Sequence, residues 1–261
     1  MRIEDVQAID IHSHFGPPHG GERETVITDR SAEKLLHNMK KANIAVSVNS
    51  SWYGLVPEGS GYSVRGNAQC LSDAEKHPEI YMWVIVDPHE PETFRQAEEL
   101  LKHPKVLGLK IHPQLHGYRL MDEGEQLFSF AAAHGAPVLG HAGMEGCMPA
   151  DYGFFAGRFP DVPVIAAHLG CGFDPAPYIR ALEENKAGNL YTDTSSAASI
   201  ASDLLEFAVS RIGCDRILFG TDSQSYFSPC QRARIDKADL TDAEKLAILR
   251  GNALRLFPQL A

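Results

Sequence analysis

Ala8-Ile9-Asp10-Ile11-His12-Ser13-His14-Phe15 is an apolar run that carries two histidines two positions apart. Side chains alternate between the two faces of a strand, so His12 and His14 are predicted to project to the same side. Two imidazoles at the end of a strand present two ligands to one metal ion. A hydrogen-bonded pair in a polar part of the core is the alternative interpretation, and this stretch alone does not decide between them.

Seven further runs rich in Val, Ile and Leu follow, each separated from the next by a longer segment with helical spacing. This alternation predicts parallel strands joined by crossover helices. Eight units of about 33 residues each match a (β/α)8 barrel, the TIM barrel. We therefore expect one α/β domain over residues 1–261. The predicted strands are Ala8–Phe15, Ile44–Ser51, Tyr81–Pro88, Val106–Pro113, Pro137–Gly143, Val162–Gly170, Leu190–Ser196 and Ile217–Gln224.

The connections between the runs carry recognisable helix signals. Capping side chains precede a predicted helix over 32–41, and Thr241 with Glu244 forms a capping-box pattern before a C-terminal helix. Two longer connections, 16–30 and 52–66, are rich in Gly, Pro and polar residues and are expected to be loops. In a barrel they follow the carboxyl ends of strands, so His19, Trp52 and Tyr53 would overhang the mouth where substrates bind.

Composition excludes several classes of function. Lys and Arg number 24 against 34 Asp and Glu, a net charge of −10, so the surface is expected to repel nucleic acid and anionic membranes. No stretch approaches the roughly 18 apolar residues of a membrane span, and acidic residues stand where a secretory signal needs an apolar segment, so a cytoplasmic protein is expected. The five cysteines never form a Cys-x-x-Cys pair, and neither a disulfide framework nor a cysteine zinc site is predicted.

Polar residues with metal-binding or catalytic chemistry stand near the ends of four later runs: Lys110, His141, His168 and Asp222. Taken singly, each histidine fits a hydrogen-bonded core residue and Asp222 fits a helix cap. Parallel barrel strands deliver their carboxyl ends to one ring, however, so these groups and the histidines of the first strand are expected to converge. Imidazoles with a carboxylate suit zinc or another divalent transition metal.

The ordered set resembles the amidohydrolase superfamily of metal-dependent barrels, most of all its compact amidohydrolase-related branch of hydrolases and decarboxylases. The resemblance rests on the His-x-His, the histidines that end the fifth and sixth runs, Gly-Thr-Asp in the eighth and the closing stretch Arg250–Phe257. It covers nearly the whole chain. The first strand begins close to the start of the sequence, which implies that the flanking β-sandwich of larger members is absent.

The resemblance also implies roles for individual residues. His168 would orient or deprotonate the attacking water, and Asp222 would serve both as a ligand and as a proton acceptor. The implied metal ligands are His12, His14, His141 and Asp222.

Lys110 leaves the number of metal ions open. Other superfamily members carry a carbamylated lysine on the fourth strand that bridges two metals, whereas a free ammonium here would hold a substrate carboxylate and repel a second cation. We expect one zinc ion, or two if Lys110 is carbamylated. His112 shares its strand parity with Lys110 and is a candidate for the second metal or the substrate. Arg119 is a further candidate for binding an anionic substrate.

Two enzymatic functions and one non-enzymatic function are compatible with these residues. The first is a hydrolase whose metal-bound water attacks the carbonyl carbon of a small amide, lactone or ester. The second is a non-oxidative decarboxylase or hydratase of an aromatic or conjugated acid, which needs a cation facing the departing carboxylate. The third, a non-catalytic metal-binding barrel, fits poorly with a site at an open barrel mouth. The sequence leaves a homo-oligomer open.

Overall fold

Eight parallel strands form the centre of the computed structural model, which describes residues 2–16, 31–56, 59–196, 198, 201–223 and 225–261. The strands pair in chain order, as the sequence predicts, and they form a TIM barrel. They are β1 (Ala8–Phe15), β2 (Ile44–Ser51), β3 (Ile80–Ile85), β4 (Val106–Ile111), β5 (Val138–Gly140), β6 (Val164–Ala166), β7 (Leu190–Asp193) and β8 (Ile217–Leu218).

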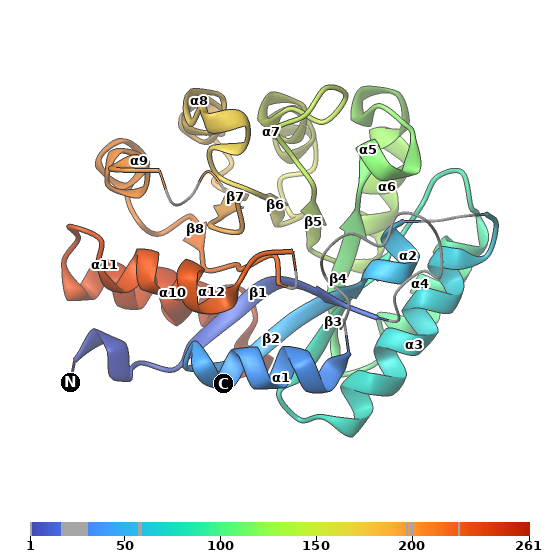
Figure 1. The fold of residues 1–261 in the computed structure, drawn as a ribbon. Coiled ribbons are helices and arrows are strands. Elements are labelled where there is room, and N and C mark those ends of the chain that lie inside the picture. The colour runs from blue at the N-terminus through green and yellow to red at the C-terminus, as the bar shows by residue number, and fades with distance from the viewer. Residues whose placement is uncertain (1, 17–30, 57–58, 197, 199–200, 224) are drawn as a thin grey trace.

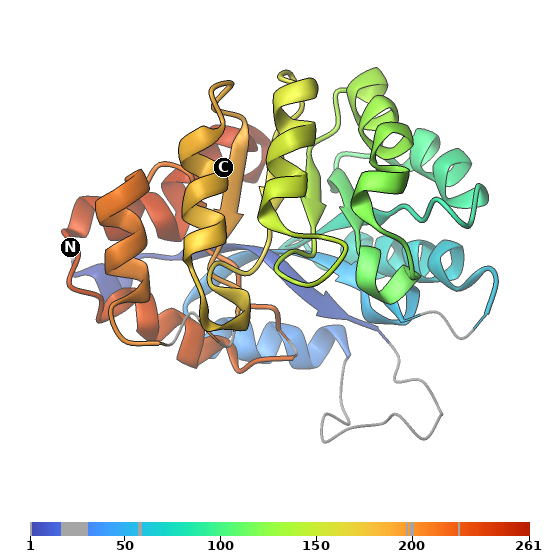
Figure 2. The same ribbon diagram turned by 90° about the horizontal axis from the view of Figure 1, so that it is seen from above.

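Helices surround the strands, as Figures 1 and 2 show from two directions. The helices are α1 (Ala32–Lys41), α2 (Trp52–Leu55), α3 (Tyr62–Lys76), α4 (Glu92–Leu100), α5 (Pro113–His116), α6 (Leu120–His134), α7 (Pro149–Arg158), α8 (Ala176–Glu184), α9 (Leu204–Ile212), α10 (Ser228–Asp236), α11 (Asp242–Leu246) and α12 (Asn252–Leu256). A π-helical turn over Ala247–Gly251 joins α11 to α12, and short 3-10 turns lie at Ile3–Asp5, Cys171–Phe173 and Pro258–Leu260. In the described part of the chain, no helix has both the length and the apolar character that crossing a membrane requires.

The predicted helix starts at Ser31 and Thr241 are confirmed, because both side chains cap the helices that follow. The prediction that 52–66 is a loop is wrong at both ends of the range, since α2 occupies 52–55 and the first turn of α3 begins at 62. A Cβ on Gly66 would lie 2.7 Å from the Cα of Gly54, so these small residues permit close packing of α2 on α3. The other expected loop lies, with His19, at 17–30, outside the described residues.

The barrel interior is packed with apolar side chains, which leaves only its mouth for chemistry. Ile9, Ile11 and Trp83 belong to one buried cluster with side chains of the other strands and with Phe257 and Leu260 after the last helix. The Trp83 indole donates a hydrogen bond from Nε1 to the carbonyl of Ile11 at 2.8 Å and meets Phe257 edge to face. The C-terminal segment therefore closes the bottom of the barrel.

A bulge in β1 turns its histidines toward the interior. Asp10 pairs with Ser47 and Ser13 with Asn49, so β1 advances by three residues where β2 advances by two. Strict alternation would place His14 on the face opposite the interior residues Ile9 and Ile11. The extra residue reverses the parity, and His14 reaches the barrel mouth on the interior side.

Backbone hydrogen bonds between β1 and the segment directly after β8 close the barrel, and the buried Asp10 carboxylate reinforces this seam. Its Oδ1 accepts from the backbone amides of His12 at 3.1 Å and Thr221 at 3.0 Å, and its Oδ2 accepts from the Thr221 hydroxyl at 2.6 Å. The amide of Asp222 in turn donates to the carbonyl of His12 at 2.8 Å. One carboxylate therefore links the two chain segments that carry His12 and Asp222.

Replacing Thr221 by Val is expected to lower the free energy of unfolding by about 1–3 kcal/mol, because the buried Asp10 Oδ2 loses its hydroxyl donor. Denaturant unfolding in the presence of a chelator measures this loss without a contribution from bound metal. Thr221→Ser keeps the hydroxyl and is expected to stay within about 1 kcal/mol of the wild type. Equal stability of the Val and wild-type proteins would contradict this role for Thr221.

Candidate active site

The candidate site begins at the carboxyl end of β1, where both histidines are buried. His12 Nδ1 lies 2.8 Å from Asp193 Oδ2, at the last residue of β7. A carboxylate only accepts, so Nδ1 carries the ring proton and Nε2 keeps its lone pair. That lone pair faces the Lys110 ammonium group, whose Nζ lies 2.9 Å away.

His14 joins β1 to the segment after β8. Its Nε2 lies 3.0 Å from Asp222 Oδ1, and its Nδ1 is 2.9 Å from the Ser50 hydroxyl and 3.3 Å from the Ser50 carbonyl. The Asp222 carboxylate only accepts, so in this structure Nε2 carries the ring proton and Nδ1 accepts from the Ser50 hydroxyl. The Ser50 carbonyl can accept from Nδ1 instead if the proton moves there, which leaves the lone pair on Nε2. Ligand atoms of His12, His14 and Asp222 lie within 4.8 Å of one another.

A chain of hydrogen bonds fixes the proton positions of two further histidines. His168 Nδ1 lies 2.6 Å from the carbonyl oxygen of Ser195, so this nitrogen is the donor. Its Nε2 must then accept from His141 Nδ1, at 2.9 Å. His141 therefore keeps a lone pair on Nε2, and this atom is buried without a hydrogen-bond partner among the described residues.

Two site residues have backbone conformations that L-residues rarely adopt. His168 has φ 70° and Asp222 has φ 50°, in the left-handed region. The His168 amide donates to Asp193 Oδ1 at 3.0 Å, and the Asp222 carbonyl accepts from Ser225 at 2.8 Å. The surrounding bonds thus hold both residues in strained positions, a feature that clusters at functional sites.

Burial controls the charges of the imidazoles. It lowers the pKa of His12 to about 3, and the nearby Lys110 ammonium adds to this effect. Burial likewise lowers the pKa of His14, and it lowers the pKa of His141 far below the usual range. These three rings are therefore neutral at physiological pH, the state in which imidazole binds metal ions.

The other charged groups stay ionised. Burial lowers the pKa of Lys110 to about 8, although the carboxylates of Asp222 and Asp193 act in the opposite direction. Burial by itself would raise the pKa of both carboxyl groups, but the histidines beside them outweigh it and bring both pKa values below the ordinary range. At neutral pH the site therefore holds two carboxylates and one ammonium group.

The donor set fits a divalent transition metal. His12, His14 and Asp222 form one group of nitrogen and oxygen donors, and His12, His168 and Asp193 form a second; His141 belongs to neither group in this structure. The lone pairs on His12 Nε2 and His141 Nε2 are set by their hydrogen-bond partners. Carboxylates that hold a ligating imidazole by its other nitrogen are typical of metal sites, and Asp193 has this relation to His12.

Of the two remaining predicted residues, one lies at the site and the other does not. His112 belongs to the site, because its ring stacks on that of His141 with centroids 4.1 Å apart and planes 11° apart. Arg119 is exposed at the start of α6, and its guanidinium contacts none of the described histidines and carboxylates above.

Sequence reasoning missed two residues that organise the site. Asp193 holds His12 and the His168 amide, and the Ser195 hydroxyl lies 2.8 Å from His12 Nδ1 and 2.9 Å from His168 Nδ1. Asp193 stands at the end of the seventh strand, so the strand-end position that identified the other site residues would also have identified Asp193.

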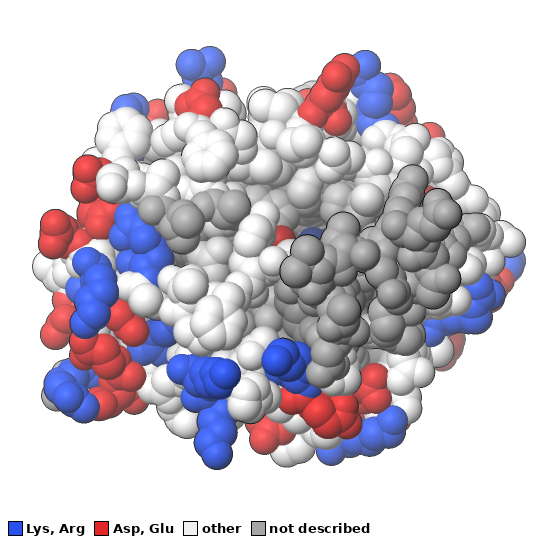
Figure 3. All heavy atoms as spheres, viewed as in Figure 1, with Lys and Arg blue, Asp and Glu red and all other residues white. Residues whose placement is uncertain are grey.

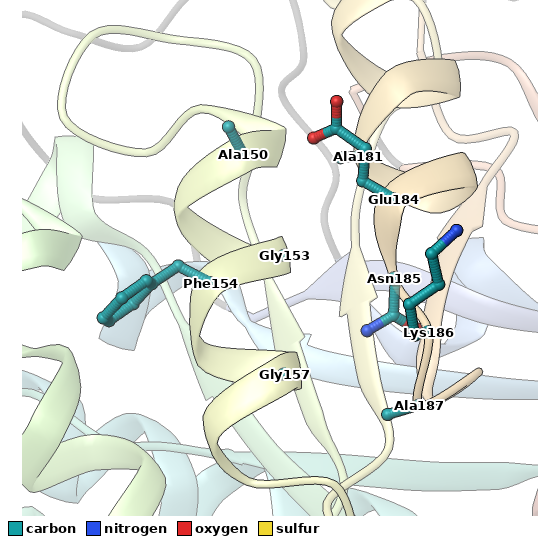
Figure 4. A pocket seen from close by; sticks show the side chains of 9 residues that line it. All are labelled: Ala150, Gly153, Phe154, Gly157, Ala181, Glu184, Asn185, Lys186 and Ala187. Carbon is teal, nitrogen blue, oxygen red and sulfur yellow. The ribbon is translucent and has the colours of Figure 1, made fainter.

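A groove of about 490 Å³ between α7 and α8 lies elsewhere, on the outer helical layer (Figure 4). Its polar lining consists of Glu184, Asn185 and Lys186, and Phe154 points away from α8. No histidine lines it, so the strand-end cluster remains the candidate active site. Seen from the side of Figure 1, the molecular surface is hollowed near its centre, and charged residues lie mostly at the edge (Figure 3).

Comparisons with known proteins agree with this fold. No curated protein sequence matches the chain. Among solved structures, 2,6-dihydroxybenzoate decarboxylase from Rhizobium is similar with a TM-score of 0.73 and 14% identity, over 99% of both chains. An amidohydrolase described as putative, from Staphylococcus aureus, is similar with a TM-score of 0.74 and 17% identity, over 97% of this chain and 100% of the other.

A third similar structure contains a metal ion. It is 5-carboxyvanillate decarboxylase from Novosphingobium aromaticivorans, complexed with manganese and 4-hydroxy-3-methoxy-5-nitrobenzoic acid. The TM-score is 0.73 and the identity 13%, over 98% of this chain and 97% of the other. In sequence, the model of the amidohydrolase family matches residues 9–259. The chain therefore belongs to the amidohydrolase family.

Proposed function

We propose that His12, His14, His141 and Asp222 hold one divalent metal ion. The observation that supports this set is the arrangement of lone pairs: Asp193 leaves Nε2 of His12 free of a proton, and His168 does the same for Nε2 of His141. When bound, the metal would supply Lewis-acid polarisation of a substrate oxygen or a water molecule of lowered pKa. The sequence suggested zinc, and the manganese in a similar decarboxylase makes manganese an equal candidate.

We propose further that the reaction is a non-oxidative decarboxylation of a small aromatic or conjugated acid, the function that sequence analysis placed second. The position of Lys110 supports decarboxylation over hydrolysis. Its side chain is buried, and its Nζ lies 2.9 Å from the nitrogen of His12 that would bind the metal. The ammonium group and a metal ion cannot share that lone pair, so in the metal-bound enzyme Lys110 needs a different hydrogen-bond acceptor. A substrate carboxylate is such an acceptor.

The reaction requires the protein to hold a carboxylate and to deliver one proton. The bond between the carboxylate carbon and the neighbouring carbon breaks, and carbon dioxide leaves. The electron pair stays on the neighbouring carbon, which takes the proton. His168 is the candidate proton carrier, because the Ser195 carbonyl holds its Nδ1 as a donor and leaves Nε2 as the nitrogen that can gain and lose a proton. While Nε2 carries the proton, it cannot accept the hydrogen bond from His141 Nδ1.

Hydrolysis is the second candidate, and the same lysine supports it in another chemical state. A buried lysine whose pKa is lowered to about 8 has more neutral amine available for carbamylation than a surface lysine. A carbamate at Lys110 would add an anionic ligand and favour two metal ions. His168 would then act as the base for a water molecule that attacks an amide, lactone or ester carbonyl.

The wider setting stays as predicted from sequence. A small-molecule substrate suits the hollow in Figure 3, and the similar decarboxylases bind such ligands. A cytoplasmic location, a homo-oligomer and a lack of nucleic-acid or membrane partners remain predictions.

Replacing Asp193 by Asn is expected to weaken metal binding by about 10- to 100-fold, because the amide no longer fixes the proton of His12 on Nδ1. Competition with a chromogenic chelator measures the dissociation constants for zinc and manganese. Asp161→Asn, an exposed change in the loop after α7, is the matched control and should bind as the wild type does. Unchanged affinity in a correctly folded Asp193→Asn protein would exclude this role.

Replacing Lys110 by Met is expected to reduce carbon dioxide release from aromatic acids by at least about 100-fold while one metal ion per chain is retained. Carbon dioxide is measured directly, and the metal content by elemental analysis. Lys105→Met removes the half-buried lysine just before β4 and is the control. A fall from two metal ions to one in the Lys110 variant, with turnover of esters or lactones but not of acids by the wild type, would favour the hydrolase instead.

A further inference from the structure

His112 has a structural task that fixes its proton position. It follows β4 as the N-cap residue of α5, and its Nδ1 accepts a hydrogen bond from the backbone amide of Leu115 at 3.3 Å. Pro113 stands at the first helical position, where no amide hydrogen is needed. A nitrogen that accepts from an amide carries no proton of its own, so the ring proton of neutral His112 is on Nε2.

This proton position separates the two roles that the sequence left open for His112. A ring with Nδ1 engaged by an amide and a proton on Nε2 has no lone pair for a metal ion. No described residue accepts a hydrogen bond from Nε2. His112 is 7% exposed as a residue, and its ring lies flat against that of His141, a proposed metal ligand. His112 Nε2 is not among the fully buried polar atoms that lack a partner. A donor that solvent can reach and that no described residue accepts from is suited to an acceptor on a ligand.

We infer that His112 is a specificity residue that donates from Nε2 to an oxygen of the substrate carboxylate. This inference rests on the proposed function. Lys110 lies in β4 and His112 directly follows that strand, so we assign them to one two-point site: the ammonium group supplies charge, and the imidazole supplies a directed N–H donor. An acid with an ionised carboxylate satisfies both groups, whereas a neutral amide or ester lacks the charge for Lys110 and places one weaker acceptor at His112.

Two substitutions separate the cap from the donor. Asn is a preferred N-cap residue whose side-chain oxygen can replace Nδ1, but it has no group at the position of Nε2. Gln places an amide N–H near the position of Nε2, but it is a poor replacement for the cap. His112→Asn therefore keeps the start of α5 and removes the donor, and His112→Gln does the reverse.

The test is calorimetric binding of benzoate and crotonate to the metal-loaded protein, with benzamide as the neutral comparison. His112→Asn is expected to weaken binding of the carboxylates by about 10- to 100-fold with little change in melting temperature. His112→Gln is expected to bind them within about threefold of the wild type and to melt at a lower temperature, because it lacks the cap. Benzamide is expected to bind weakly to all three proteins.

Three results would overturn the inference: equal carboxylate binding by His112→Asn and the wild type, equally weak binding by both variants, or no carboxylate binding by the wild type. The experiment does not depend on turnover. A wild type that binds benzoate through His112 but releases no carbon dioxide from any acid would overturn the proposed decarboxylation and leave this inference standing. If the wild type releases carbon dioxide and neither variant changes the rate of release, the role of His112 is overturned and the proposed decarboxylation stands.

Discussion

The seam between β8 and β1 is the contact on which the fold and the site both depend. A parallel barrel closes only if its last strand meets its first, and here backbone hydrogen bonds join β1 to the segment directly after β8. The carboxylate of Asp10 supplements them by binding the amides of His12 and Thr221 and the Thr221 hydroxyl. The same closure brings His14 against Asp222. Fold stability and metal-site geometry therefore share one set of buried polar contacts.

Two groups that can only accept hydrogen bonds determine which ring nitrogens of the site are protonated. The Asp193 carboxylate fixes the proton of His12, and the Ser195 carbonyl fixes that of His168 and, through it, that of His141. For His112 a donor fixes the proton: the backbone amide of Leu115 donates to Nδ1, which leaves the ring proton on Nε2. Four imidazoles of the same intrinsic chemistry thus have different proton positions, and the proposed function assigns them different tasks: two would keep a lone pair for a metal, one would handle a proton, and one would donate to a ligand.

Much of this site was predictable because barrel topology converts sequence order into proximity. The histidines at 12, 14, 141 and 168 and the aspartate at 222 each end an apolar run, and parallel strands bring such ends together. The bulge in β1 was not predictable, because it depends on the register against β2 rather than on the composition of β1. Gly54 and Gly66 were misjudged for a related reason: glycine in a loop and glycine between packed helices look the same in sequence.

The sequence by itself determined the barrel, its strand order, the family and the residue types that gather at the mouth, because hydrophobic periodicity and the placement of polar residues at strand ends are local properties. Only the tertiary structure decided which nitrogen of each histidine is protonated, that Lys110 faces His12, and that Asp193 and Ser195 organise the rings. Those features depend on distances of about 3 Å between side chains far apart in the chain, and hydrogen-bond direction at that range is fixed by packing, not by sequence order.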